Sequence, residues 1–304
     1  FRLHFTDLNT EATSPELILF FKKEGADFQY AALRSSSNEK WAISDQEVKF
    51  VSILPLYTLP EKKEQSHTQA SVPVSNFTPE TLDKISKKIS LQFKDNNESN
   101  GFESASPVCY ANSSEVNEEF KTKVYPQEFT PIDLLDYIYG NLYSPSYLKE
   151  NKDLLKSGFL KIPLPKNQIE FWKLAEIGKQ LRQLHLLEGE SFKQVETLFP
   201  IGGDNIVKEV RFEENYEIQK GDVIIHIDPL FPMGRIYINE TQYFECVPQH
   251  SWEFLLGEYP PAKSWLTKKM GQSLTSEEIY HFQKIIHALT ETGRIIKEME
   301  EIKF

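Results

Sequence analysis

The sequence predicts an α+β protein, in which a small N-terminal α/β piece is followed by a mainly helical domain with an inserted antiparallel β-meander. Helical spacing of apolar residues dominates residues 128–188 and 249–301, whereas period-two, β-branched segments lie between residues 206 and 246. These segments show no strand–helix–strand repetition of the kind that builds a parallel sheet. We therefore expect helix–sheet–helix order in the larger domain.

The size and composition are those of a folded chain with two domains. The 304 residues are 39% hydrophobic and 26% charged, which provides enough apolar material for a core. At about 150 residues per domain, two domains are expected. The polar, aperiodic stretch 61–75 is typical of a linker, so we predict a boundary there, with residues 1–75 and 76–304 as the two parts.

The N-terminal part is expected to combine a helix with short strands. Ser14 and Pro15 are typical of a helix start, and they predict a helix from Glu16 to Lys23. The run Val48 to Leu59 is apolar and begins with β-branched residues, which favours a strand. Because proline cannot donate to a β-ladder, Pro55 marks an edge strand or the exit from one.

Helix signals recur through the larger part. Thr78 and Pro79 are typical of a helix start, and this helix is expected to run to about Phe93. A second helical stretch is expected to break into two helices at Ser144 and Pro145, because the residue before a proline is biased away from helical geometry. The stretches predicted to be helical after the first are 131–156, 168–188, 249–256, 261–268 and 276–301. The expected strands are IVKEVRF, DVIIHI and GRIYINETQYFE.

Cysteine usage and hydropathy favour a cytoplasmic protein with no membrane partner. Cys109 and Cys246 are far apart and have no Cys or His at metal-ligand spacing nearby, so neither a disulfide framework nor a zinc site is predicted. No apolar run approaches the roughly 18 residues that span a bilayer. The chain begins with Phe1, and Arg2 to Phe5 already have strand character, so we expect a fragment of a longer protein.

Sequence motifs for catalysis are absent. The sequence has neither the glycine-rich dinucleotide fingerprint nor a phosphate-binding loop. Glu-x-Lys triplets at Glu119–Lys121 and Glu301–Lys303 resemble part of a metal-dependent nuclease site, but no Asp-bearing strand precedes them convincingly. His281 and His287 are six positions apart on one predicted helix, which places them on different faces. We therefore expect no catalytic centre and no metal site in this chain.

The net charge restricts the kind of DNA binding that is possible. A formal charge of −11 has the wrong sign for coating nucleic acid nonspecifically. Sequence-specific binding needs only a local basic face and a few well-placed donors and acceptors. We expect such a face to hold six basic residues, namely Lys161, Arg211, Arg235, Lys263, Lys268 and Lys269.

Two polar and aromatic segments have both a structural and a functional interpretation. In YGNLYSPSY, the tyrosines either pack in the core of a helix corner or form a DNA-contacting edge; the residues concerned are Tyr143, Ser144, Tyr147 and the following Lys149. In INETQYFE, Asn239, Gln242 and Tyr243 either form a polar hairpin turn or read bases, since Asn and Gln can pair bidentately with adenine.

Six blocks in order carry a family resemblance: YIYGNLYSPSYLKE, FLKIPLP, FWKLAEIGKQLRQLHLLE, GRIYINETQYFECVP, GEYPPAKSWLTKK and EEIYHFQKIIHALTETGRIIKEME. Over residues 128–302 they resemble the C-terminal half of type ISP and related type IIG restriction–modification proteins. Upstream, ILPLYTLPE and NFTPETL resemble the junction with the methyltransferase core of that family, so residues 1–60 are expected to be its tail. The chain departs from the family at Leu148, Leu160 and Lys161, where relatives carry arginine or proline, and a basic cluster is reduced to Lys268, Lys269 and Gln272.

The resemblance implies a recognition role for this chain. It implies docking on double-stranded DNA, selection of the target sequence, and presentation of an adenine to an adenine-N6 methyltransferase domain of the same polypeptide, with a possible nuclease domain. S-adenosylmethionine, and Mg²⁺ where a nuclease is present, would bind in those other domains, so no cofactor is expected here. The family's Asn-Pro-Pro-Tyr motif does not occur in the chain, whose Pro260 and Pro261 have a different context. The alternative is a protein–protein assembly module of a larger complex.

Overall fold

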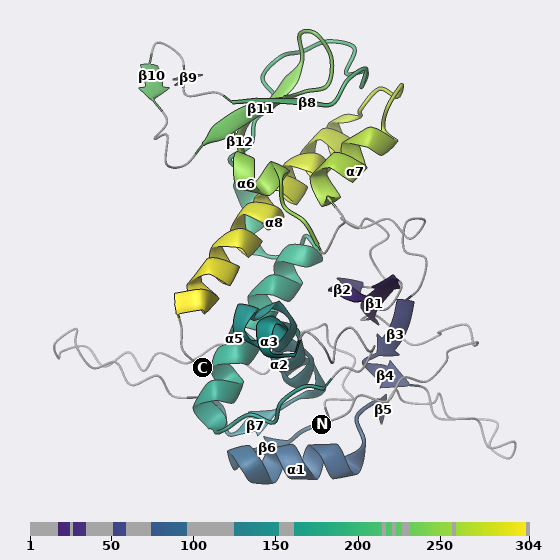
Figure 1. Ribbon diagram of the computed structural model, residues 1–304, viewed down its shortest axis with the longest axis vertical. Helices are drawn as coiled ribbons and strands as arrows, with labels where there is room; N and C mark the ends of the chain where they lie inside the picture. Colours follow the sequence, from purple (N-terminus) through teal and green to yellow (C-terminus); the bar gives the residue numbers. More distant parts are fainter. Residues whose placement is uncertain are drawn as a thin grey trace, which may run out of the picture. The chain divides into compact units, whose positions relative to one another are not determined.

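The computed structural model describes residues 18–24, 27–34, 51–58, 74–95, 125–151, 161–214, 217–220, 223–226, 232–256 and 260–301 (Figure 1). These residues form two compact units. Unit 1 takes its described residues from the range up to Arg182, and unit 2 takes them from Gln183 to Glu301. Helices and antiparallel sheets occur together, which confirms the α+β class. The boundary predicted within 61–75 falls mainly on residues outside the described ranges and stays a prediction.

The N-terminal segment of unit 1 is a three-stranded antiparallel sheet of order β2-β1-β3. Its strands are β1 (Ile18–Glu24), β2 (Asp27–Arg34) and β3 (Val51–Pro55). The helix predicted from Glu16 to Lys23 is therefore wrong. An apolar run such as ILFF suits a strand as well as a helix, and here β1 is the central strand, whose backbone pairs on both sides.

The expected edge at Pro55 is confirmed, because β3 lies at the edge of the sheet and ends at that residue. Ser14, Pro15 and the strand expected at Arg2 to Phe5 lie outside the described residues.

A short helix between two small strand pairs follows. Strand β4 (Tyr57–Thr58) pairs with β5 (Val74–Ser75), and β6 (Gln92–Phe93) pairs in parallel with β7 (Glu128–Phe129). Helix α1 (Pro79–Ile89) begins as predicted, since the Thr78 hydroxyl accepts a hydrogen bond from the Thr81 amide at 3.3 Å. It ends earlier than expected because Ser90 takes a left-handed conformation.

Three helices form the core of unit 1: α2 (Pro131–Tyr143), α3 (Pro145–Glu150) and α5 (Gln168–His185), whose last turn extends past Arg182. The predicted break at Ser144 and Pro145 is confirmed. A capping box starts α2: the Thr130 amide donates to the Asp133 carboxylate at 2.8 Å, and the Asp133 amide donates to the Thr130 hydroxyl at 3.4 Å. Every residue of α2 is buried.

Helices α2 and α5 approach closely at two glycines. An added Cβ at Gly178 would lie 1.8 Å from the Asp136 carbonyl oxygen, and one at Gly140 would lie 2.4 Å from the Leu174 carbonyl oxygen. Beside this crossing, Arg182 donates to both carboxylate oxygens of Asp136, at 2.6 and 3.0 Å. The two glycines therefore set the helix spacing at which this buried ion pair forms.

The main sheet of unit 2 has the order β12-β11-β8, and all neighbours are antiparallel. Its strands are β8 (Arg211–Glu214), β11 (Met233–Tyr237) and β12 (Tyr243–Pro248). The predicted strand DVIIHI does not join it, because β10 (Val223–His226) pairs with β9 (Glu217–Lys220) as a separate hairpin. Of IVKEVRF, only the final Arg211 and Phe212 are in a strand.

The helical part of unit 2 comprises the 3₁₀ helix η2 (Glu190–Lys193) and helices α6 (Gln249–Trp252), α7 (Pro261–Lys268) and α8 (Ser276–Glu301). The predicted bounds of α7 and α8 are confirmed, whereas α6 ends four residues before Leu256. Helices α6 and α7 both pack against α8. The inward residue Phe244 meets Phe282 of α8 with ring centroids 4.6 Å apart, so the sheet and α8 share one core.

Candidate nucleic-acid interface

The outward face of the main sheet carries a group of arginines and tyrosines. Side chains alternate along a strand, so the buried Gly234 and Ile236 of β11 point inward, while the half-buried Arg235 and Tyr237 point outward. The register places Tyr237 opposite Tyr243 of β12. On its other side, Tyr237 is opposite Arg211 of β8.

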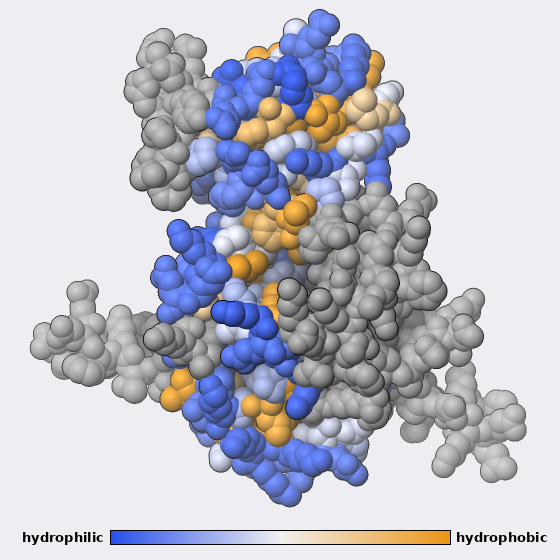
Figure 2. All heavy atoms as spheres, in the orientation of Figure 1, coloured by the Kyte–Doolittle hydropathy of each residue, from blue (hydrophilic) through white to orange (hydrophobic). Residues whose placement is uncertain are grey.

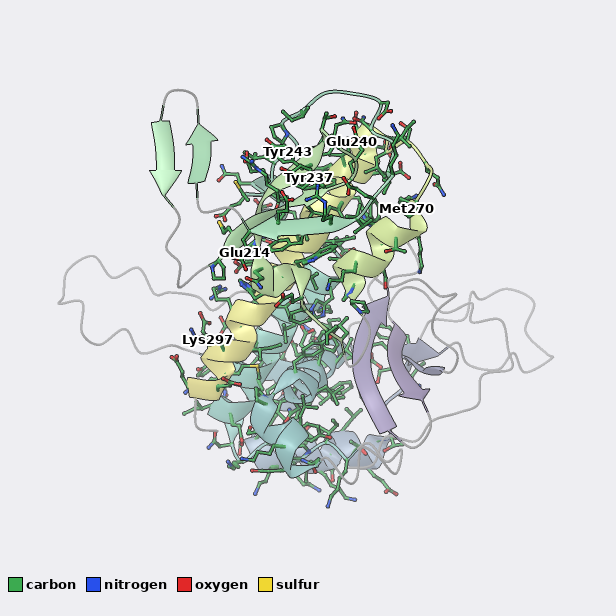
Figure 3. The ribbon with its side chains drawn as sticks, turned by 45° about the horizontal axis from the view of Figure 1, so that its top comes forward. Glu214, Tyr237, Glu240, Tyr243, Met270 and Lys297 are labelled. Atoms are coloured by element: carbon green, nitrogen blue, oxygen red, sulfur yellow. The ribbon has the colours of Figure 1, made fainter. Side chains whose placement is uncertain are left out.

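These four outward side chains form a stack, which we call the arginine–tyrosine ladder: Arg211, Tyr237, Tyr243 and Arg235. The Arg211 guanidinium carbon lies 4.6 Å from the centroid of the Tyr237 ring, and the two tyrosine centroids are 5.1 Å apart. The Arg235 guanidinium carbon lies 4.6 Å from the Tyr243 centroid. Figure 3 shows Tyr237 and Tyr243 beside each other in unit 2. Cross-strand contacts and cation–π attraction thus fix the ladder.

Carboxylates orient both arginines. The Glu245 side chain is buried and accepts from Arg235 Nε at 2.9 Å. Burial opposes the charge of Arg235, but the hydrogen bond and negative charge of Glu245 outweigh it, so the pKa of Arg235 is raised. Arg211 donates to Glu209 at 3.1 Å and also to Glu213. Each guanidinium therefore has a carboxylate partner within the protein, which is buried for Arg235 and more exposed for Arg211.

The Tyr243 hydroxyl of the ladder stays neutral near pH 7. Partial burial raises the pKa of Tyr243, against the lowering effect of Arg235. A neutral phenol both donates and accepts hydrogen bonds, so the ladder combines cationic forks with a neutral polar group. This chemistry suits phosphate oxygens and guanine edges, which arginine binds through two parallel hydrogen bonds.

A buried amide network lies directly beside the ladder, in the turn between β11 and β12. Gln242 Nε2 donates to the Ile201 carbonyl at 3.1 Å and to Asn205 Oδ1 at 2.7 Å. Gln242 Oε1 accepts from the Asn205 amide at 2.9 Å and from Asn239 Nδ2 at 3.0 Å. Gln242 is 1% exposed, and both donors and both lone pairs of its amide are used within the protein.

The sequence matches the profile of the Type ISP C-terminal specificity domain over residues 11–298. The chain belongs to this family. Among curated proteins, none matches the sequence.

The fold of this specificity domain is also similar to three solved structures, each aligned over 96% of the chain. One is the ATP-dependent Type ISP restriction-modification enzyme LlaBIII bound to DNA (TM-score 0.53, 17% identity). Another is a nuclease-deletion mutant of the Type ISP restriction-modification enzyme LlaGI in complex with a DNA substrate mimic (TM-score 0.50, 18% identity). The third is a DrdV–DNA complex (TM-score 0.55, 15% identity). The specificity domain spans 16%, 18% and 25% of those chains, respectively.

Two residues for which base reading was one of two interpretations have internal partners in the specificity domain. Asn239 and Gln242 are 6% and 1% exposed, and the side-chain oxygen Oδ1 of Asn239 accepts from the backbone N–H of Gln242 at 2.8 Å. The structural interpretation of INETQYFE therefore applies to these two residues, because their amide groups already serve the turn. The third, Tyr243, is half-buried on the outward face and belongs to the ladder.

The tyrosine corner in unit 1 also follows its structural interpretation. Tyr143, Ser144 and Tyr147 are buried, and the Tyr147 hydroxyl donates to the Lys161 carbonyl at 3.1 Å. Burial raises the pKa of Tyr147 to about 12. We therefore assign these three side chains to packing, whereas the neighbouring Lys149 is exposed.

The six basic residues expected on one face are divided between the units. Lys161 is exposed in unit 1, and the other five belong to unit 2. Lys269 donates to Glu278 at 2.7 Å, so at least three of the five in unit 2, counting the two ladder arginines, have carboxylate partners. Lys263 lies 5.3 Å from the centroid of the Trp252 ring, and Lys268 is exposed on α7. The cationic part of the site is thus largely neutralised by the protein itself.

Sequence reasoning missed Tyr237 and Glu245. Strand alternation within GRIYINETQYFE places Tyr237 on the same face as Arg235, which was the available signal. The roles of both residues depend on the register of β11 with its neighbours, which the sequence does not display.

Among the described residues, no group of three or more His, Cys, Asp or Glu side chains is arranged to hold a metal ion. None of the helices in the described ranges combines the length and apolar character of a bilayer-spanning segment.

Proposed function

We propose that this specificity domain binds double-stranded DNA and selects the target sequence for a restriction–modification enzyme whose chemistry is performed by other domains. The arginine–tyrosine ladder is the observation that carries the proposal. Family membership supports it, and the three similar structures are of proteins in complex with DNA or a DNA mimic.

The geometry of the ladder favours few, oriented contacts over many electrostatic ones. A guanidinium stacked on a ring and held by a carboxylate loses little freedom when it binds, so its hydrogen bonds to a guanine edge or a phosphate cost little ordering entropy. The carboxylates also screen the arginines from arbitrary phosphates. DNA has to replace or share those carboxylate contacts, which favours a ligand of matching shape and disfavours nonspecific duplex.

The remaining parts of the proposal follow from the family resemblance. We propose that the same polypeptide contributes an adenine-N6 methyltransferase domain, which uses S-adenosylmethionine, and in a nuclease-bearing relative of type ISP or type IIG also a Mg²⁺-dependent nuclease. The specificity domain would then hold the duplex while the target adenine turns out of the stack into the methyltransferase pocket. Such an enzyme acts on intracellular DNA, so a cytoplasmic location is part of this proposal.

Selection from a randomised duplex pool at low salt tests the proposal. The chain is expected to enrich one short sequence. An Arg211→Ala, Arg235→Ala double variant is expected to lose the enrichment, whereas Lys193→Ala, which removes one exposed lysine on η2, should retain it. If the wild-type chain enriches nothing but associates with a methyltransferase domain, the assembly-module alternative replaces this proposal.

A further inference from the structure

The end of unit 2 next to the ladder consists of three loops that are exposed but firmly held. They are 201–205, 239–242 and 269–274, and we call them together the loop tip. Figure 3 labels Glu240 and Met270 on two of them. Exposed residues of the tip include Ile201, Gly202, Asp204, Glu240, Met270 and Gly271. In the space-filling view, apolar and hydrophilic residues are intermixed on the visible face of unit 2 (Figure 2).

Backbone hydrogen bonds join the loops to one another. The Leu274 amide donates to the Asn205 carbonyl at 2.9 Å, and the Gly271 amide donates to the Val207 carbonyl at 2.8 Å. The Ser273 hydroxyl adds a bond of 2.6 Å to the Asp204 carbonyl. Loops joined in this way are not free to move independently.

The buried Gln242 side chain holds the loop 201–205 by hydrogen bonds. Its amide holds the Ile201 carbonyl and the backbone amide of Asn205, which are the two ends of the loop. An added Cβ at Gly203 would lie 2.7 Å from the Gln242 side chain, so the loop rests directly on this amide. Asn205 takes a left-handed conformation, with φ at 54°, and returns the chain to the sheet. The exposed part of the loop is thus positioned by a buried side chain.

The exposed chemistry of the loop tip fits base edges better than phosphates. Its charged side chains are those of Asp204, Glu240 and Lys269. Asp204 accepts hydrogen bonds from the Ile206 amide at 3.0 Å and from Lys208 Nζ at 3.2 Å, and Lys269 donates to Glu278. The Glu240 carboxylate is exposed and repels phosphate. Carboxylates accept hydrogen bonds from the exocyclic amino groups of cytosine, and apolar side chains such as Ile201 and Met270 pack against thymine methyl groups. Both groups are displayed in the major groove. At Gly202 nothing lies within 4 Å of an added Cβ, so a neighbouring molecule can approach the backbone closely.

We propose that the loop tip is a preformed reading element that enters the major groove of the target duplex, and that Gln242 is the positioning residue that sets its shape. This inference rests on the proposed function and makes it specific: the ladder anchors the duplex, and the loop tip discriminates among sequences. Preorganisation matters because a loop that is already ordered spends no binding energy on becoming ordered.

Steric blocking at Gly202 tests the proposal. Gly202→Phe adds a large side chain in open space, so the melting temperature should be unchanged. The selectivity, measured as the ratio of dissociation constants for a scrambled and the enriched duplex, is expected to fall at least about tenfold, the effect of losing one good base contact. Gln194→Phe, at an exposed position outside the loop tip, is the control and should change the ratio by less than about twofold.

A second variant tests the role of Gln242. Gln242→Glu keeps the size of the side chain but presents a carboxylate oxygen to the Ile201 carbonyl and to Asn205 Oδ1 in place of two N–H donors. Amide hydrogen exchange in the loop is expected to accelerate, with loss of selectivity but retention of weak binding to any duplex. If Gln242→Glu fails to fold, Gly202→Phe carries the test alone.

The outcomes separate this inference from the proposed function. A wild-type chain that enriches no duplex refutes the proposed function, and the inference with it. A wild-type chain that enriches a sequence, together with a folded Gly202→Phe variant of unchanged selectivity, overturns the inference alone. The inference is also overturned if Gly202→Phe disrupts binding to another protein domain while DNA selectivity is retained.

Discussion

The crossing of α2 and α5 makes Gly178→Ala a severe change, although alanine is the better helix former. The alanine Cβ would lie 1.8 Å from the Asp136 carbonyl oxygen, 2.6 Å from its carbon and 2.8 Å from the Gly140 nitrogen. All three are backbone atoms, so no rotamer change relieves the contact. The two helices have to separate by at least about 1 Å, in a core packed as densely as an organic crystal.

The expected loss of stability follows from two costs and one gain. Overpacking of a core costs about 1–3 kcal/mol. Separation also weakens the buried Asp136–Arg182 pair, whose disruption costs about 3–5 kcal/mol when it is complete. Replacing glycine by alanine within a helix returns about 1 kcal/mol. With the pair disrupted completely, the lower ends of these ranges leave a net loss of about 3 kcal/mol, equivalent to a fall in Tm of roughly 6–12 °C.

Urea and thermal unfolding of the wild-type chain and two variants measure this effect. Gly202→Ala is the matched control, because the same substitution at an open position should change the free energy of unfolding by less than about 0.5 kcal/mol. A Gly178→Ala variant within about 1 kcal/mol of wild type would refute the reasoning. It would show that α2 and α5 separate at little cost, and hence that the glycines do not set the helix spacing.

Three further predictions concern pH, capping and the ladder. Burial lowers the pKa of His185 to about 4 in the folded state. The contribution of the neutral imidazole to the free energy of unfolding is therefore fully present above pH 6.5, and it falls by up to about 3 kcal/mol as the pH drops to 4. His185→Gln should remove this dependence in unfolding titrations at several pH values. Thr130→Ala removes the cap of α2 and should cost about 1–2 kcal/mol in urea unfolding. The control variant Thr130→Ser keeps the hydroxyl and should cost less than about 0.5 kcal/mol. An equally small cost for Thr130→Ala would argue against the capping box. Glu245→Gln removes the charge that holds Arg235, so affinity for scrambled duplex should rise roughly threefold and selectivity should fall. Anisotropy titrations measure both dissociation constants. Unchanged dissociation constants would show that Glu245 does not restrain the arginine.

Local signals predicted α7 and α8 of unit 2 well. Pro261 and Ser276 mark the starts of α7 and α8, and apolar spacing gives their lengths, so nothing outside each segment was needed. The same kind of signal failed for Glu16 to Lys23. There the helix-start residues precede the segment directly, but β1 is a strand because its backbone pairs with two other strands. One of these, β3, lies some thirty residues further along the chain.

The site was predictable only in part, for the same physical reason. The sequence shows that Asn239 and Gln242 carry amides suited to adenine, but it does not show that Ile201 and Asn205, about forty residues earlier, use those amides first. The arginines were singled out by charge alone. Their stacking on tyrosine rings and their pairing with glutamates depend on strand register, which turned an expected basic face into an almost neutral, oriented one.

This chain by itself is expected to distinguish one duplex sequence from others. The most direct measurement is the ratio of its dissociation constants for a scrambled duplex and for the duplex enriched from a random pool, at one fixed salt concentration. A ratio of about a thousand or more is predicted, as for other specific DNA-binding proteins. A ratio near one, with a folded chain, would contradict the claim and assign sequence selection to another part of the protein.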